Sequence, residues 1–289
     1  MGTQRYKKLN RVQDLMMEGQ VVPASWLLEH GYSGALLKKY TAGGWLNSPA
    51  RGVYRRPGPP LQWQHVAASL QRLSDFSLHI GGRTTLTQQG RAHYLPMRGN
   101  ETIRLYGPDT LPAWVNALGV AERIEGRSDA MFGALRAMRD ANTGALATGK
   151  LDAAGLFNEK WGAWNTSLCY SSDERAIFEL LQDVPTRESV HEADVLMQGM
   201  VNLRPVLLLK LLKACTSIKV KRLFLALAER HGHAWFKHLD HSKFTLGKGK
   251  RMLEPGGTLH PRYLISLLGD LDDHARYVEG CADLSLAHG

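Results

Sequence analysis

The spacing of apolar side chains in the first sixty residues predicts a small helical unit followed by a β-hairpin. A helix over residues 4–18 places its apolar positions on one face, and Pro23 opens a second helix. Ser33 can cap a third helix whose apolar side chains recur at the spacing of one buried face. Two short strands are expected at residues 45–46 and 52–56, on either side of a polar turn. This order of elements is typical of a winged helix-turn-helix.

The pattern after Pro57 predicts a mixed α and β arrangement that becomes strongly helical. Short strands are expected at residues 77–80 and 101–106. The segment 204–214 is apolar almost all round, so we expect it to be a buried central helix. Together with this segment, the expected helices cover residues 62–73, 84–90, 172–183, 190–200 and 218–231.

Length and composition favour a cytoplasmic protein with two cores. The chain has 289 residues, of which 44% are hydrophobic, which is enough for two domains. Its three cysteines are odd in number and far apart, so we expect reduced thiols. The N-terminal residues are too polar for a signal peptide, and no apolar run approaches the length of a spanning helix. We therefore expect no contact with a membrane.

The net charge of +9 is concentrated in two parts of the chain. Residues 1–57 carry nine Lys and Arg against three acidic residues. Cations on a helix and a wing suit a phosphate backbone, where each neutralised phosphate releases a counterion. The expected DNA-binding residues are Arg5, Lys7, Lys8, Ser33, Lys38, Lys39, Arg51, Tyr54, Arg55 and Arg56.

A second cationic cluster lies between residues 210 and 251, with eleven Lys and Arg against two acidic residues. It could provide additional contact with DNA or a docking face for an acidic protein, and the sequence leaves both readings open. On the helix 218–231, we expect Lys219, Lys221, Arg222 and Arg230 to lie largely outside. The candidate contact residues are Lys210, Lys213, Lys219, Lys221, Arg222, Lys248, Lys250 and Arg251.

Catalytic and metal-binding patterns are weak. Four histidines between His231 and His241 lie near Asp240, but their spacing fits no standard tetrahedral site. Thr148-Gly149-Lys150 resembles the end of a phosphate-binding loop, yet Leu151 stands where that loop needs a hydroxyl residue, and a surface loop is the simpler interpretation. The chain contains no GxSxG motif. We expect no catalytic residue, no metal and no cofactor.

An ordered series of motifs resembles the AbiEi antitoxins of type IV toxin–antitoxin systems. The motifs are GYSGALLKKYTAGGWLNSPARGVYRRPG, then HIGGRTTLTQQGRAHYL, and later RLFLALAERHGHAWFKHLD with LGKGKR. The similarity covers most of the chain and implies an α+β protein. Residues 1–95 would form an N-terminal winged helix-turn-helix DNA-binding domain, and residues 96–289 a larger mixed, mainly helical antitoxin domain.

The resemblance implies a repressor of its own operon that binds inverted-repeat operator DNA and neutralises a cognate nucleotidyltransferase toxin. The second cationic cluster would then meet either the toxin or additional DNA. We expect a monomer in solution that assembles in several copies on DNA, since one winged helix reads only a few base pairs. The alternative is a stand-alone winged-helix regulator whose C-terminal domain senses a ligand or oligomerises. An enzyme acting on nucleic acid is a third and weaker interpretation.

Overall fold

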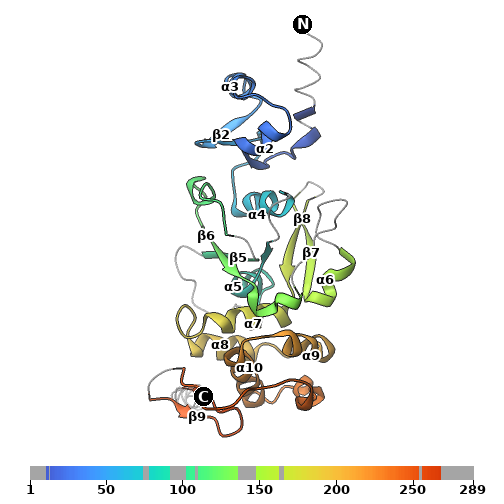
Figure 1. Ribbon diagram of the computed structural model, residues 1–289, viewed down its shortest axis with the longest axis vertical. Helices are drawn as coiled ribbons and strands as arrows, with labels where there is room; N and C mark the ends of the chain where they lie inside the picture. Colours follow the sequence, from blue (N-terminus) through green and yellow to red (C-terminus); the bar gives the residue numbers. More distant parts are fainter. Residues whose placement is uncertain are drawn as a thin grey trace, which may run out of the picture.

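The computed structural model describes residues 11–12, 14–73, 78–91, 102–107, 110–135, 148–162, 166–253 and 256–267. The molecule is long and narrow, with three parts stacked along its long axis (Figure 1). A small N-terminal unit lies at one end, a five-stranded sheet lies in the middle, and a group of helices lies at the other end. The structure confirms the expected α+β class with a larger C-terminal domain.

The N-terminal unit contains the predicted pair of helices and the hairpin. Its elements are β1 (Val21–Pro23), α2 (Ala24–Glu29), α3 (Gly34–Ala42), β2 (Asn47–Ala50) and β3 (Val53–Arg55). The three strands form an antiparallel sheet in the order β1-β3-β2. This is the arrangement of a winged helix-turn-helix, with a hydrophobic core of its own.

The hairpin differs from the prediction in two details. Its first strand starts at Asn47 rather than Trp45, because the backbone N–H groups of Trp45 and Leu46 bond back to the carbonyl of Tyr40. The turn therefore falls at Arg51-Gly52, where Gly52 has a positive φ of 73°. Strand β1 was not predicted, since three apolar residues before a helix carry no alternation to mark a strand.

The central sheet has the strand order β6-β5-β4-β8-β7. Strand β4 lies in the middle, antiparallel to β5 and parallel to β8. The elements of this part are α4 (Trp63–Arg72), β4 (His79–Ile80), α5 (Gly82–Gln88), β5 (Thr102–Gly107), η1 (Val115–Ala117), β6 (Arg123–Ser128), η2 (Ala130–Leu135), α6 (Thr148–Ala154), β7 (Leu156–Trp161) and β8 (Thr166–Ser171).

Helix α4 joins the N-terminal unit to the sheet. Its apolar side packs with the core of the sheet, and Gln71 exchanges hydrogen bonds with the backbone of Cys169 on β8. On the other side, the Ser69 hydroxyl accepts a hydrogen bond from the N–H of Val21 on β1 at 2.8 Å. Helix α5 packs against α7 and belongs to a separate core, which includes Leu86. The segment that contains α4, β4 and α5 therefore packs and pairs with elements that come after residue 101 in the chain.

The C-terminal helices follow the predicted boundaries closely. They are α7 (Asp173–Asp183), α8 (Val190–Gln198), α9 (Pro205–Ala214) and α10 (Ile218–Arg230), followed by η3 (Ala234–His238), η4 (His241–Lys243) and the small hairpin of β9 (Thr258–Leu259) and β10 (Ser266–Leu267). The prediction that 204–214 is the buried central helix is wrong. Helix α9 exposes Val206 and both of its lysines, whereas every residue of α10 from Val220 to Ala228 is buried.

Candidate nucleic-acid interface

Helix α3 is the predicted reading helix, and the structure gives it one buried and one exposed face. The Ser33 hydroxyl accepts a hydrogen bond from the N–H of Leu36, which caps the helix as expected. Leu37 and Tyr40 are buried in the N-terminal core. Lys38 and Lys39 are exposed. Lys38 and Lys39 therefore project from a helix that the hydrophobic core of the N-terminal unit holds in place.

The wing presents Arg51 at its tip. The Ser48 hydroxyl lies 3.1 Å from the carbonyl oxygens of both Ala50 and Val53, which closes the turn around Arg51. Arg51 itself is exposed. Tyr54 is half-buried and packs against the N-terminal core. Of the predicted wing residues, Arg51 thus has the position best suited to a phosphate contact.

The prediction that Arg55 and Arg56 line the outer side of the wing needs correction. Arg55 is only 7% exposed, and its guanidinium donates hydrogen bonds to the carbonyls of Gly19 and Pro59. Burial lowers the pKa of Arg55. Arg56 is partly buried and donates to the carbonyl of Met16 at 2.7 Å. In this arrangement both guanidinium groups hold the third strand against neighbouring turns, while Arg5, Lys7 and Lys8 lie outside the described residues.

Arg11 was counted in the charge of the N-terminal part but was not singled out as a site residue. The structure exposes it at the start of the described chain, next to the helix-turn-helix. Burial raises the pKa of Tyr32, and the positive charge of Arg11 partly offsets this rise. The basic pattern of residues 5–11 is the signal that could have included it.

The second cationic cluster also contains buried members, and the expectation that Lys221 and Arg222 lie largely outside is wrong, whereas Arg230 is exposed as expected. Arg222 is 1% exposed and Lys221 is 5% exposed. The Lys221 ammonium donates to the carbonyl of Thr245, and the half-buried Lys219 donates to the carbonyls of Gln182 and Val184. Arg230 lies 3.5 Å from the carboxylate of Asp194. Lys219, Lys221 and Arg222 thus stabilise the fold, because they bond to carbonyls of segments that are distant in sequence.

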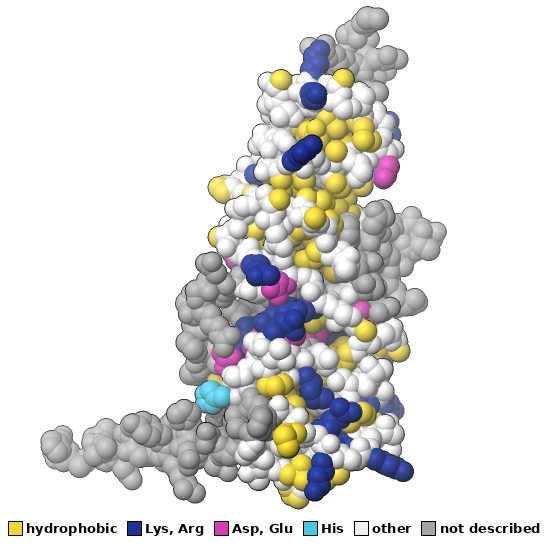
Figure 2. Space-filling model, turned by 60° about the vertical axis from the view of Figure 1, so that its left-hand side comes forward, with side chains coloured by type: hydrophobic (Ala, Val, Ile, Leu, Met, Phe, Trp, Pro, Cys, Tyr) yellow, Lys and Arg dark blue, Asp and Glu magenta, His cyan; other side chains and the backbone are white. Residues whose placement is uncertain are grey.

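The other members of this cluster are exposed. Lys210 and Lys213 project from the outer face of α9 beside the exposed Val206, and the loop after η4 carries Lys248, Lys250 and Arg251. Figure 2 shows Lys and Arg side chains gathered over the C-terminal end of the molecule, at the opposite end of the long axis from the winged helix.

Two of the four histidines between residues 231 and 241 bond to other parts of the fold. His231 Nε2 lies 2.8 Å from the carboxylate of Asp194, and His233 Nε2 lies 2.7 Å from the carbonyl of Met197. Residues 148–154 form α6, where a surface loop was expected. Among the helices that the structure describes, none is long and apolar enough to cross a membrane.

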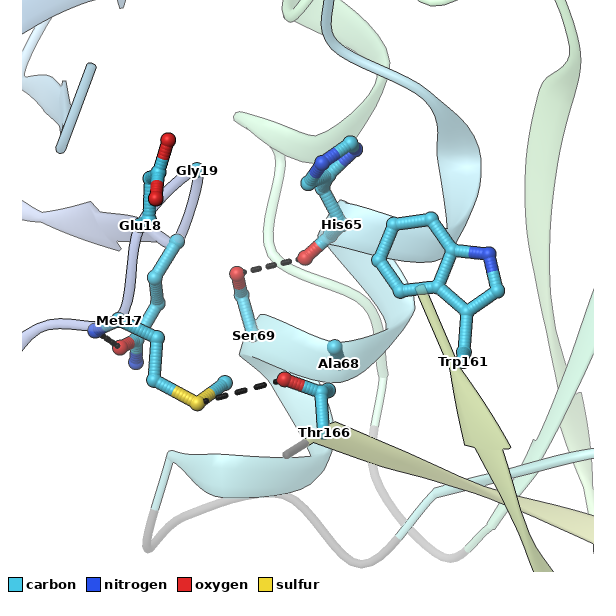
Figure 3. A pocket seen from close by; sticks show the side chains of 9 residues that line it. Met17, Glu18, Gly19, His65, Ala68, Ser69, Trp161 and Thr166 are labelled. Carbon is cyan, nitrogen blue, oxygen red and sulfur yellow. Dashed lines mark hydrogen bonds between the residues drawn. The ribbon is translucent and has the colours of Figure 1, made fainter. Parts of the chain in front are cut away.

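A small cavity lies between the N-terminal unit and the sheet (Figure 3). Its walls include the turn at Met17–Gly19, one side of α4 at His65 and Ser69, and the sheet residues Trp161 and Thr166. The Thr166 hydroxyl lies 3.4 Å from the sulfur of Met17, and the rings of His65 and Trp161 meet edge to face. The space is about that of one water molecule, so we interpret it as a packing seam between the two parts.

Comparison with known families and structures assigns both parts of the chain. Residues 5–97 match the family described as the N-terminal domain of the AbiEi antitoxin transcriptional regulators. Residues 100–268 match the family described as transcriptional regulator, AbiEi antitoxin, type IV toxin–antitoxin system. No curated protein matches. The crystal structure of the Rv2827c protein from Mycobacterium tuberculosis is similar in fold, with a TM-score of 0.52, 15% identity, and 89% of this chain and 90% of that chain covered.

Proposed function

Since the chain belongs to the AbiEi antitoxin transcriptional regulators of type IV toxin–antitoxin systems, we propose a division of labour between its two ends. The winged helix binds inverted-repeat operator DNA and represses the protein's own operon. The C-terminal domain neutralises a cognate nucleotidyltransferase toxin. Both activities belong to the cytoplasm, and the protein acts as a regulator rather than an enzyme.

The observation that best supports DNA binding is the exposure of Lys38 and Lys39 on α3 together with Arg51 at the tip of the wing. A recognition helix meets base edges in the major groove, while an adjacent wing contacts the phosphate backbone. Gly34, in the first turn of α3, has open space around its α-carbon, which permits close approach of DNA to this end of the helix. We propose a monomer that binds DNA in several copies, one for each half-site.

Support for the toxin-binding role comes from the exposed face of α9. Val206 is 85% exposed, and it lies one and two helical turns before Lys210 and Lys213. An apolar side chain beside two exposed ammonium groups suits the core and rim of a protein interface with an acidic partner. We therefore assign this face to the toxin and the winged helix to operator DNA.

Charge reversal at each end of the full-length protein tests this division. We expect Lys38→Glu with Lys39→Glu to abolish operator binding and leave rescue of toxin-expressing cells intact. Lys210→Glu with Lys213→Glu should do the opposite. All four side chains are exposed, so both variants should fold. A promoter reporter and a growth assay, measured on the same strains, would reject the division if either variant lost both activities.

A further inference from the structure

The loop of residues 246–251, Leu-Gly-Lys-Gly-Lys-Arg, is organised by one buried side chain. The Arg222 guanidinium donates to the carbonyl of Leu246 at 2.7 Å, to that of Gly249 at 2.6 Å and to that of Gly247 at 3.2 Å. It also donates to the carbonyl of Leu264 at 3.1 Å. Its charge is thus surrounded by carbonyl dipoles, whose oxygens all point inward.

This arrangement fixes the direction of the amide groups in the same loop. In a planar trans peptide the N–H points opposite to the C=O. The N–H groups of Gly247, Lys248 and Lys250 therefore point away from Arg222. In the part of the chain that the structure describes, they make no hydrogen bond to another residue. Amides that point out of a loop in this way are available as hydrogen-bond donors to an anion.

The side chains in and under the loop also favour binding of an anion. Lys248, Lys250 and Arg251 are exposed, and the buried Lys221 and Arg222 lie directly beneath the loop. Gly247 and Gly249 have positive φ values of 65° and 81°, which gives the loop its tight path. No carboxylate is bonded to any of these five cations in the described residues.

We propose that residues 246–251 form a phosphate-binding loop. The ligand is a phosphate group that accepts hydrogen bonds from the outward amides and pairs with Lys248 and Lys250. A nucleic-acid backbone and a free nucleotide both carry this group. The proposal does not depend on the winged helix, because the loop lies at the opposite end of the molecule (Figure 1).

Binding measurements on the full-length protein test the proposal. To remove the N-terminal interface, every sample carries Lys38→Ala with Lys39→Ala. The probes are inorganic pyrophosphate, ATP, and a fluorescein-labelled duplex without operator sequence. We expect Lys248→Ala with Lys250→Ala to weaken binding of at least one probe by tenfold or more. Lys160→Ala with Lys237→Ala removes the same charge from other exposed positions and should change binding by less than twofold.

A third variant separates the backbone site from simple charge attraction. Gly249→Ala keeps every charge and meets no neighbour within 4 Å, but alanine disfavours the positive φ of this residue. We expect it to weaken binding at least fivefold, with the thermal unfolding midpoint of the protein unchanged within a few degrees. In the parent protein, the amide NMR signals of Gly247, Lys248 and Lys250 should shift on addition of the probe.

Three results would overturn the proposal: no probe binds, the control variant loses as much affinity as the loop variant, or Gly249→Ala binds like its parent. Competition between pyrophosphate and the duplex identifies the source of the phosphate. Displacement of the duplex by pyrophosphate indicates a site for isolated phosphates, and retention of the duplex indicates a nucleic-acid backbone. Operator binding and growth rescue, measured separately, report on the proposed function and can fail independently.

Discussion

His79 Nε2 on β4 lies 2.8 Å from Oε1 of Glu179 on α7, and both side chains are buried. The other oxygen of this carboxylate accepts from the Ser171 hydroxyl and the N–H of Gly82, while Arg175 donates to Oε1. One carboxylate thus joins two strands, α5 and α7. Burial alone would raise the pKa of Glu179, but His79 and Arg175 more than offset it and lower the pKa to about 2.

Replacement of this carboxylate should destabilise the protein strongly. We expect Glu179→Gln to lower the free energy of unfolding by about 3 kcal/mol, because Arg175 is left buried without its counter-charge. Urea denaturation followed by circular dichroism measures the loss. Glu159→Gln, at an exposed position of β7, is the matched control and should stay within about 0.5 kcal/mol of the parent. Equal midpoints for the two variants would contradict the structural role of Glu179.

The same pair predicts a fall in stability on acidification. Burial lowers the pKa of His79, and Arg175 adds to this, although Glu179 opposes it. Below a pH of about 6.5, the unfolded chain gains a proton at this histidine that the folded chain does not. Stability is therefore lost as the pH falls. The depressed pKa of Glu179 extends the loss, since its contribution is complete above the ordinary glutamate pKa and disappears toward pH 2.

The variant His79→Gln removes the first of these two titrations. Between pH 7 and pH 5.5, we expect the variant to lose about 1 kcal/mol less stability than the parent. Urea midpoints at several pH values give the slope. His238→Gln, which changes an exposed histidine, should retain the pH dependence of the parent. Parallel pH profiles for His79→Gln and the parent would show that His79 does not titrate on unfolding.

Exposed and buried cations of the winged helix should behave differently on DNA. We expect Lys38→Ala with Lys39→Ala to reduce the salt slope of operator binding by about 2, and Arg51→Ala to reduce it by about 1. Arg55→Ala should leave the slope unchanged and lower the unfolding midpoint, because its guanidinium bonds to Gly19 and Pro59. Electrophoretic shifts across salt concentrations decide between these outcomes. A reduced slope for Arg55→Ala would place this residue on DNA.

Two glycines allow the seam between the N-terminal unit and the sheet to be tested. Gly19 and Gly31 have similar φ values of 74° and 84°. A β-carbon at Gly19 would lie 2.8 Å from Cδ2 of His65, whereas one at Gly31 would meet nothing within 4 Å. We expect Gly31→Ala to cost about 1 kcal/mol from backbone strain alone, and Gly19→Ala to cost at least about 2 kcal/mol. Equal losses in the free energy of unfolding would mean that His65 can move away from Gly19 at little cost.

The position of β4 determines which C-terminal fragment can fold. The proposed domain boundary near residue 96 follows from the family resemblance, but a fragment that starts there lacks His79, β4 and α5. We expect residues 60–289 to unfold cooperatively in urea. Residues 96–289 should not, because the sheet loses the strand that joins β5 to β8. Cooperative unfolding of the shorter fragment would show that the strands on either side pair without β4.

The sequence by itself determined the elements that depend on local spacing. The boundaries of α7, α8, α9 and α10 were predicted within about two residues, since apolar periodicity and caps act over a few neighbouring positions. Ser33 was identified as the cap of α3 for the same reason. The concentration of positive charge in two parts of the chain also followed directly from the sequence.

Only the tertiary structure decided which of those charges face outward. Arg55 bonds to a carbonyl 36 residues away, and Arg222 bonds to carbonyls 24 to 42 residues away, so no local pattern marks them as buried. For the same reason the sequence did not predict that β4 is the middle strand of the sheet. Its two residues pair with strands that come much later in the chain. Burial of a polar side chain requires partners for its hydrogen bonds, and here long-range packing supplies them.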